Sequence, residues 1–144
     1  SIAHAHPMYG KTFSTLGKML DPISQDSCAF YERTAIFADY DGVANGPDEG
    51  INIAKALGDK EFCILQNHGI LTTGSMVDTA VWYFLNMEDA CKSQLLAEAV
   101  GKPKVIPHDT ACATRDYVAN DLSAFVSFQP TIDVLWEEEP DLLD

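Results

Sequence analysis

The sequence predicts one α/β domain, and three observations support this fold class. The chain has 144 residues, the size of an ordinary domain with a core of its own. Its composition, 47% hydrophobic and 22% charged, is typical of a soluble globular protein. Short apolar runs bounded by turn residues, such as 62–65, alternate with longer segments of helical periodicity, such as 76–99. No internal repeat or low-complexity linker divides the chain, so it is one domain or part of one.

The first half of the chain predicts short strands and two helices. Tyr9, Phe13 and Leu16 recur at helical spacing behind Pro7, whose fixed φ suits the first turn of a helix. In order, the predicted elements are a strand at the N-terminal end, a helix over 8–16, strands at 28–31 and 35–37, turns at 39–42 and 45–47, and a helix from 47 to 57.

The second half predicts two further strands and a long helix. Ser75 followed by Asp78 resembles a capping box, and the apolar stripe behind it ends at Gly101. The predicted elements are a buried strand at 62–65, a turn at 66–69, a strand at 70–73, a helix over 76–99, a helix over 111–125 and a short helix around 131–136.

Charge and cysteine content exclude several classes of protein. The net charge is −13, from 9 Lys and Arg against 22 Asp and Glu, which argues against a nucleic-acid partner. No apolar run approaches the length of a membrane span, and no signal peptide is visible. The four cysteines form no C-x-x-C pair and indicate reduced, buried thiols, so we expect a cytoplasmic protein. Because the chain starts at Ser1 inside a strand, we expect an N-terminally truncated piece of a longer protein.

Three histidines are the candidate metal ligands. His4 and His6 are two residues apart, so in a strand both side chains lie on one face. His68, in Asn67-His68-Gly69, follows another predicted strand and supplies a third imidazole. Three protein ligands with an open position are typical of catalytic zinc. The alternative for His4 and His6 is a chance His-x-His pair, and the alternative for His68 is an ordinary turn histidine. The fourth histidine, His108, is interpreted as a surface residue.

The sequence resembles the class II aldolase/adducin family, the sugar-phosphate aldolases and epimerases with an AraD-like fold. The resemblance rests on the H-x-H-P of residues 4–7 and the helix behind it, on 20–26, on 67–72 and on the end of the long helix at 94–99. It implies a three-layer α/β/α domain around a mostly antiparallel sheet. It also implies that His4, His6 and His68 hold Zn²⁺, or another divalent metal such as Mn²⁺, at subunit interfaces of a homotetramer.

The implied activity is that of a metal-dependent lyase acting on a small hydroxy-carbonyl compound, with C–C cleavage through a metal-stabilised enediolate. Family members carry their acid/base carboxylate upstream of H-x-H, so the chain by itself is expected to show weak or no catalysis. Tyr31 is the candidate proton donor to a neighbouring subunit, with a half-buried strand tyrosine as the alternative interpretation. The alternative functions are a decarboxylase of a hydroxy-carboxylic acid and an adducin-like interaction domain.

Overall fold

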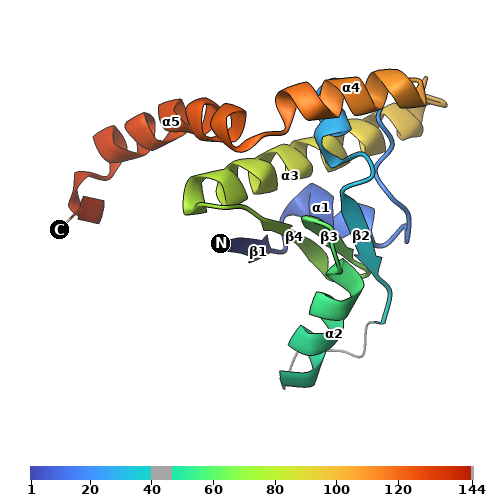
Figure 1. The fold of residues 1–144 in the computed structure, drawn as a ribbon, viewed down its shortest axis with the longest axis horizontal. Helices are drawn as coiled ribbons and strands as arrows, with labels where there is room; N and C mark the ends of the chain where they lie inside the picture. The colour runs from blue at the N-terminus through green and yellow to red at the C-terminus, as the bar shows by residue number, and fades with distance from the viewer. Residues whose placement is uncertain (40–46, 144) are drawn as a thin grey trace.

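The structure is a computed structural model that describes residues 1–39 and 47–143 (Figure 1). Its strands are β1 (Ile2–Ala5), β2 (Thr34–Phe37), β3 (Phe62–Leu65) and β4 (Gly69–Thr73). They form one mixed sheet in the order β1-β4-β3-β2. The β1–β4 and β3–β4 pairs are antiparallel, and the β2–β3 pair is parallel. The sheet is therefore mostly antiparallel, as predicted.

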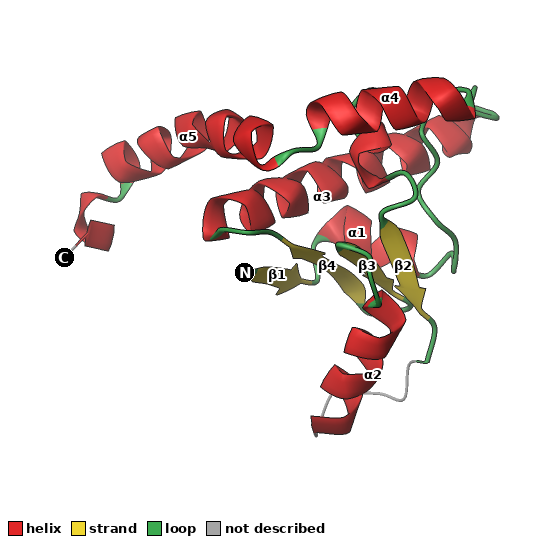
Figure 2. Cartoon of the chain, in the orientation of Figure 1, coloured by secondary structure: helices red, strands yellow, loops and turns green. Residues whose placement is uncertain are grey.

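Helices cover both faces of this sheet. They are α1 (Met8–Ser14), the 3₁₀ helix η1 (Ser27–Phe30), α2 (Pro47–Leu57), α3 (Val77–Val100), α4 (His108–Val118), α5 (Asp121–Glu138) and the 3₁₀ helix η2 (Pro140–Leu143). Figure 1 shows α1 and α3 on one side of the sheet and α2 on the other. The helices α4 and α5 follow one another along α3, and α5 extends beyond the sheet (Figure 2). Among the described residues, no helix combines the length and apolarity needed to cross a bilayer.

The alternation of side chains along β3 explains the three layers. Phe62 and Ile64 belong to the larger core cluster, together with Tyr83 and Met87 of α3. Cys63 and Leu65 face the opposite way and belong to a smaller cluster that α2 covers. Successive residues of a strand point to opposite faces, so a fully apolar strand requires a helical layer on each side. The predicted three-layer α/β/α arrangement is confirmed.

One predicted strand is wrong. Residues 28–31 do not form a strand, because residues 27–30 form the buried 3₁₀ helix η1. The hydroxyl oxygen of Ser27 accepts hydrogen bonds from the backbone N–H groups of Ile23 and Ser24, both at 2.9 Å, and these bonds turn the chain. A short apolar run is compatible with a buried helical turn as well as with a strand. Here the hydrogen bonds to Ser27 favour the helical turn.

The C-terminal helices differ from the prediction in their boundaries. The helix predicted over 111–125 is two helices, α4 and α5, which are separated at Ala119 and Asn120. The side chain of Asn120 caps α5 by accepting a hydrogen bond from the Ser123 N–H at 3.0 Å. The short helix predicted around 131–136 is the second half of α5, which continues through Pro130. The turns predicted at 39–42 and 45–47 fall largely on residues 40–46, outside the described residues.

Candidate metal centre

Strand pairing brings the three histidines to one corner of the sheet. His4 lies in β1 and pairs with Leu71 of β4, and Ala5 pairs with Ile70. His68 immediately precedes β4, at the end of the short β3–β4 hairpin in which Leu65 pairs with Gly69. Because β1 and β4 are antiparallel, the end of β1 lies beside the start of β4. His4, His6 and His68 therefore meet although more than sixty residues separate the first pair from the third.

The imidazole rings are close enough to share one cation. The ring centroids of His4 and His6 are 5.2 Å apart, those of His4 and His68 5.1 Å, and those of His6 and His68 4.5 Å. One nitrogen from each ring lies within 4.8 Å of the other two. Nδ1 of His4 is 2.9 Å from the carbonyl oxygen of Ile70, which can only accept a hydrogen bond. Nδ1 therefore carries the proton, and the lone pair of Nε2 is available to a metal.

The loop that carries His68 depends on two residues with special backbone requirements. Asn67 has φ 59°, in the left-handed region that asparagine tolerates better than most residues. Gly69, which follows His68, is required for a different reason. A Cβ at this position would lie 2.6 Å from the carbonyl oxygen of Ala5 and 3.2 Å from Cδ2 of His6. The unusual turn conformation is thus at Asn67, and Gly69 permits the close approach of β1 and His6.

The surroundings of His68 favour its neutral imidazole. Partial burial lowers the pKa of His68, and the neighbouring His4 and His6 lower it further. The carboxylate of Glu49 in α2 acts in the opposite direction and raises this pKa. Oε1 of Glu49 is buried and has no hydrogen-bond partner among the described residues. Sequence position alone makes Glu49 an acid in the first turn of a helix, since nothing in its spacing connects it with His68.

The donor set suits a divalent metal of the zinc type. Three imidazole nitrogens bound at about 2.1 Å in a tetrahedral arrangement lie roughly 3.4 Å from one another. The nitrogens here are already within 4.8 Å, so small ring rotations would close the site. His4 and His6 are exposed and His68 is half-buried, which leaves the fourth position open to solvent. The hydrogen bond from His4 to Ile70 supplies the outer-shell support that metal-binding histidines usually have.

Tyr31 lies apart from these histidines within one chain. It precedes β2, whose first residue, Thr34, pairs with Phe62 at the start of β3. His68 follows the opposite end of β3, and β1 and β2 are the two edges of the sheet. The hydroxyl of Tyr31 instead lies 3.2 Å from Nδ1 of His108, in an exposed group of side chains. His108 itself is exposed, as predicted for a surface histidine.

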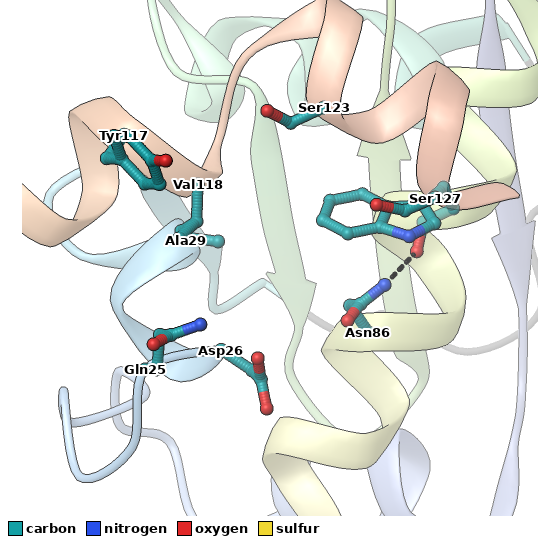
Figure 3. A pocket seen from close by; sticks show the side chains of 9 residues that line it. Gln25, Asp26, Ala29, Asn86, Tyr117, Val118, Ser123 and Ser127 are labelled. Carbon is teal, nitrogen blue, oxygen red and sulfur yellow. Dashed lines mark hydrogen bonds between the residues drawn. The ribbon is translucent and has the colours of Figure 1, made fainter.

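A pocket of about 220 Å³ also lies away from the histidines, between η1, α3 and the junction of α4 and α5 (Figure 3). Gln25 and Asp26 line one side, and Asn86 lines the other. The side chain of Asn86 donates a hydrogen bond of 2.8 Å to the backbone carbonyl of Trp82 and so is partly committed to α3 itself. None of the three histidines lines this pocket.

Comparison with known proteins places this arrangement in a family. The family described as "Class II Aldolase and Adducin N-terminal domain" matches residues 1–95. Decarboxylase NovR of Streptomyces niveus is 37% identical over 142 residues, which are 99% of this chain and 53% of the relative. The 4-hydroxy-3-prenylphenylpyruvate oxygenase/4-hydroxy-3-prenylbenzoate synthase of Streptomyces roseochromogenus subsp. oscitans is 36% identical over 99% of this chain and 51% of its own length.

The solved structure of L-fuculose 1-phosphate aldolase from Glaciozyma antarctica PI12 superposes with a TM-score of 0.88. It is 38% identical, and the match covers 97% of this chain and 53% of that one. The chain therefore spans about half the length of these relatives. The matched family region includes both β1 and the β3–β4 hairpin, and so all three histidines. On this evidence of sequence and fold, the chain belongs to the class II aldolase and adducin family.

Proposed function

We propose that this chain carries the metal centre of a lyase that cleaves a C–C bond in a small hydroxy-carbonyl compound. The observation that carries the proposal is the convergence of His4, His6 and His68, with one nitrogen of each ring within 4.8 Å of the others. A protein that used this fold only as an assembly module would not need three imidazoles turned toward one point. The match to the aldolase from Glaciozyma antarctica PI12 supports the same class of reaction.

The three histidines would hold Zn²⁺, or another divalent metal such as Mn²⁺, in an open coordination site. A divalent cation supplies Lewis-acid polarisation of a carbonyl and of the hydroxyl beside it. The chain's own part is to present three neutral imidazoles in a fixed geometry. The hydrogen bond from His4 Nδ1 to Ile70 fixes one ring, and the backbone approach at Gly69 positions another.

In this proposal, the residue that transfers a proton to the substrate comes from a second chain. Tyr31 lies at the opposite end of the strands from the histidines, so its phenol would serve the site of a neighbouring copy in a homotetramer. Its hydroxyl is exposed to solvent beside His108, where a neighbouring copy can reach it. The acid/base carboxylate is expected from a segment outside this sequence.

A decarboxylase of a hydroxy-carboxylic acid is the second candidate, because Decarboxylase NovR matches 99% of this chain at 37% identity. Loss of CO₂ next to a carbonyl leaves the same kind of negative charge as C–C cleavage of a hydroxy-carbonyl compound. The same metal centre could stabilise either one. An adducin-like interaction domain, the third candidate, would catalyse neither reaction.

The test compares the metal-free protein with protein reconstituted with Zn²⁺ or Mn²⁺, on a panel of small hydroxy-carbonyl compounds and hydroxy acids. Release of an aldehyde or ketone identifies the lyase, and release of CO₂ identifies the decarboxylase. His68→Ala should weaken metal binding by more than the roughly 100-fold typical of losing an outer-shell partner. Asp59→Asn, an exposed residue near the other end of β3, is the control and should behave like the wild type. Metal binding by His68→Ala as tight as that of the wild type, or turnover that survives metal removal, would refute the proposal.

A further inference from the structure

A second group of metal-ligating side chains lies on the opposite side of the molecule from the three histidines. It consists of Glu32, in the turn before β2, and His108 and Cys112 of α4. Glu32 and Cys112 are 80 residues apart in the sequence. None of these residues belongs to the proposed metal centre. The sequence predicts only that His108 is a surface residue.

One ligand atom from each of the three side chains lies within 4.8 Å of the other two, and both oxygens of the Glu32 carboxylate contribute to the contacts. Nδ1 of His108 is 3.8 Å from Oε1 of Glu32 and 3.9 Å from Sγ of Cys112. Sγ of Cys112 is 3.7 Å from Oε2 of Glu32. In a tetrahedral zinc site, with Zn–S near 2.3 Å and Zn–N and Zn–O near 2.1 Å, the corresponding edges are about 3.4 to 3.6 Å. Rotations of these side chains would therefore be enough to bring one ligand atom of each to such distances.

The fold holds these side chains in place from two elements. His108 and Cys112 are four residues apart in α4, so both lie on one face of the helix. Glu32 has φ 60°, a left-handed conformation that is unfavourable for glutamate and that directs its carboxylate toward α4. The guanidinium of Arg115, one helical turn beyond Cys112, contacts both the backbone carbonyl of Tyr31 and the Glu32 carboxylate at 3.4 Å. This contact ties the turn to the helix.

We propose that Glu32, His108 and Cys112, a group that is accessible within a single chain, form a second binding site for a divalent cation such as Zn²⁺. A thiolate, an imidazole and a carboxylate form a donor set that zinc accepts, and water completes the fourth position at an exposed site. Binding releases the thiol proton of Cys112 to water, since the thiolate is the ligand. A bound cation also replaces the hydrogen bond between the Tyr31 hydroxyl and Nδ1 of His108.

The two sites are separate and differ in chemistry. The first contains three nitrogens and no sulfur, and the second contains one thiolate. The other three cysteines, Cys28, Cys63 and Cys91, are buried. Cys112 is only half-buried, so a metal ion from solution can reach its thiol but not the three buried ones. A sulfur ligand detected in the folded chain would therefore come from Cys112.

The experiment titrates the metal-free chain with Co²⁺ under reducing conditions and follows thiolate-to-cobalt charge transfer in the near ultraviolet. We expect this absorption in the wild type and in His68→Ala, and its loss in Cys112→Ser and His108→Ala. Zinc content should fall from about two ions per chain to about one in Cys112→Ser. Asp109→Asn removes an exposed carboxylate from the same helix and should change neither readout.

Absence of the charge-transfer band in the wild type, or its persistence in Cys112→Ser, would overturn the second site. Neither result bears on the three histidines, whose zinc is measured separately through His68→Ala. Circular dichroism of Cys112→Ser and His108→Ala checks that the fold is unchanged. Both positions are on the surface of α4, so correctly folded variants are expected.

Discussion

At the scale of single residues, Gly69 is the position on which the candidate metal centre depends most directly. A side chain there would collide with the carbonyl oxygen of Ala5, a backbone atom that cannot move without shifting β1. The same side chain would meet the ring of His6 at 3.2 Å. The absence of a side chain thus lets the edge strand approach the hairpin closely enough for the imidazoles to meet.

Gly69→Ala is therefore expected to weaken zinc binding at the three histidines by about 10-fold or more and to destabilise the fold by about 1–3 kcal/mol, the usual cost of overpacking. Competition with a chelating dye measures the affinity, and urea unfolding measures the stability. Gly50→Ala is the matched control, since a Cβ there meets nothing within 4 Å and alanine favours the α2 helix. Wild-type zinc affinity in Gly69→Ala would contradict the close approach of β1.

Strand periodicity predicts that His4 and His6 lie on one face of a strand. That His68 joins them depends on the pairing of β1 with β4, which the sequence indicated only through the family resemblance. The sequence was insufficient for the Glu32, His108 and Cys112 group and for Glu49. These residues meet their partners through contacts between distant elements, such as η1 with α4, which no local pattern in the sequence encodes. The role of Gly69 was likewise invisible, because the atom it avoids belongs to Ala5.

At the scale of elements, the four strands and the helices α1, α2 and α3 are predicted with nearly the observed bounds, and the errors lie at η1 and in the C-terminal helices. Ser27 turns an apolar run into a 3₁₀ helix through its hydroxyl. Asn120 starts a new helix where apolar periodicity continues without a visible break. Pro130 does not end α5, although a proline usually stops or kinks a helix. In none of these three cases does the spacing of hydrophobic residues alone predict the observed structure.

The helix α3 is tied to the loop after α1 by a polar network around Gln94, which is fully buried. The amide nitrogen of Gln94 donates to Asp21 at 2.7 Å and to Glu98 at 2.8 Å, and its oxygen accepts from the Asp21 backbone N–H at 2.8 Å. Lys18 pairs with the same Glu98 carboxylate. The hydrogen bond from Lys18, followed by that from Gln94, lowers the pKa of Glu98.

A lowered folded-state pKa means that Glu98 stabilises the fold above its unfolded-state pKa, and that this contribution is lost as the pH falls through the folded value. The side chain is 30% exposed, so we expect Glu98→Gln to cost less than about 1 kcal/mol at neutral pH. The difference from the wild type should begin to shrink below the ordinary pKa of a glutamate and should vanish below the lowered pKa of folded-state Glu98. Urea unfolding between pH 7 and pH 3 measures it, with the exposed Glu137→Gln as control. A difference that is independent of pH would show that the ion pair contributes nothing.

At the scale of the whole molecule, β1 is the least embedded part of the sheet. It is an edge strand with mostly exposed residues, and only β4 pairs with it. At its start, the backbone nitrogen of Ser1 donates a hydrogen bond to the Gly74 carbonyl at 2.7 Å. Near the other end of β1, Nδ1 of His4 donates a hydrogen bond to the backbone carbonyl oxygen of Ile70. A cation held by the three histidines would join this second end of β1 to the β3–β4 hairpin.

Zinc should therefore stabilise the chain by linkage and act first on its N-terminal edge. At a free concentration about 100 times its dissociation constant, a ligand that binds only the folded state adds about 2.7 kcal/mol to the free energy of unfolding. Urea unfolding in the Cys112→Ser background isolates the effect of the histidine site, and His68→Ala in the same background should abolish it. Among amides that exchange through local opening, exchange should slow in β1 and remain unchanged in β2, at the far edge of the sheet. Equal protection of both edges would mean that zinc binds elsewhere, because the three imidazoles connect β1 only to the hairpin beside it.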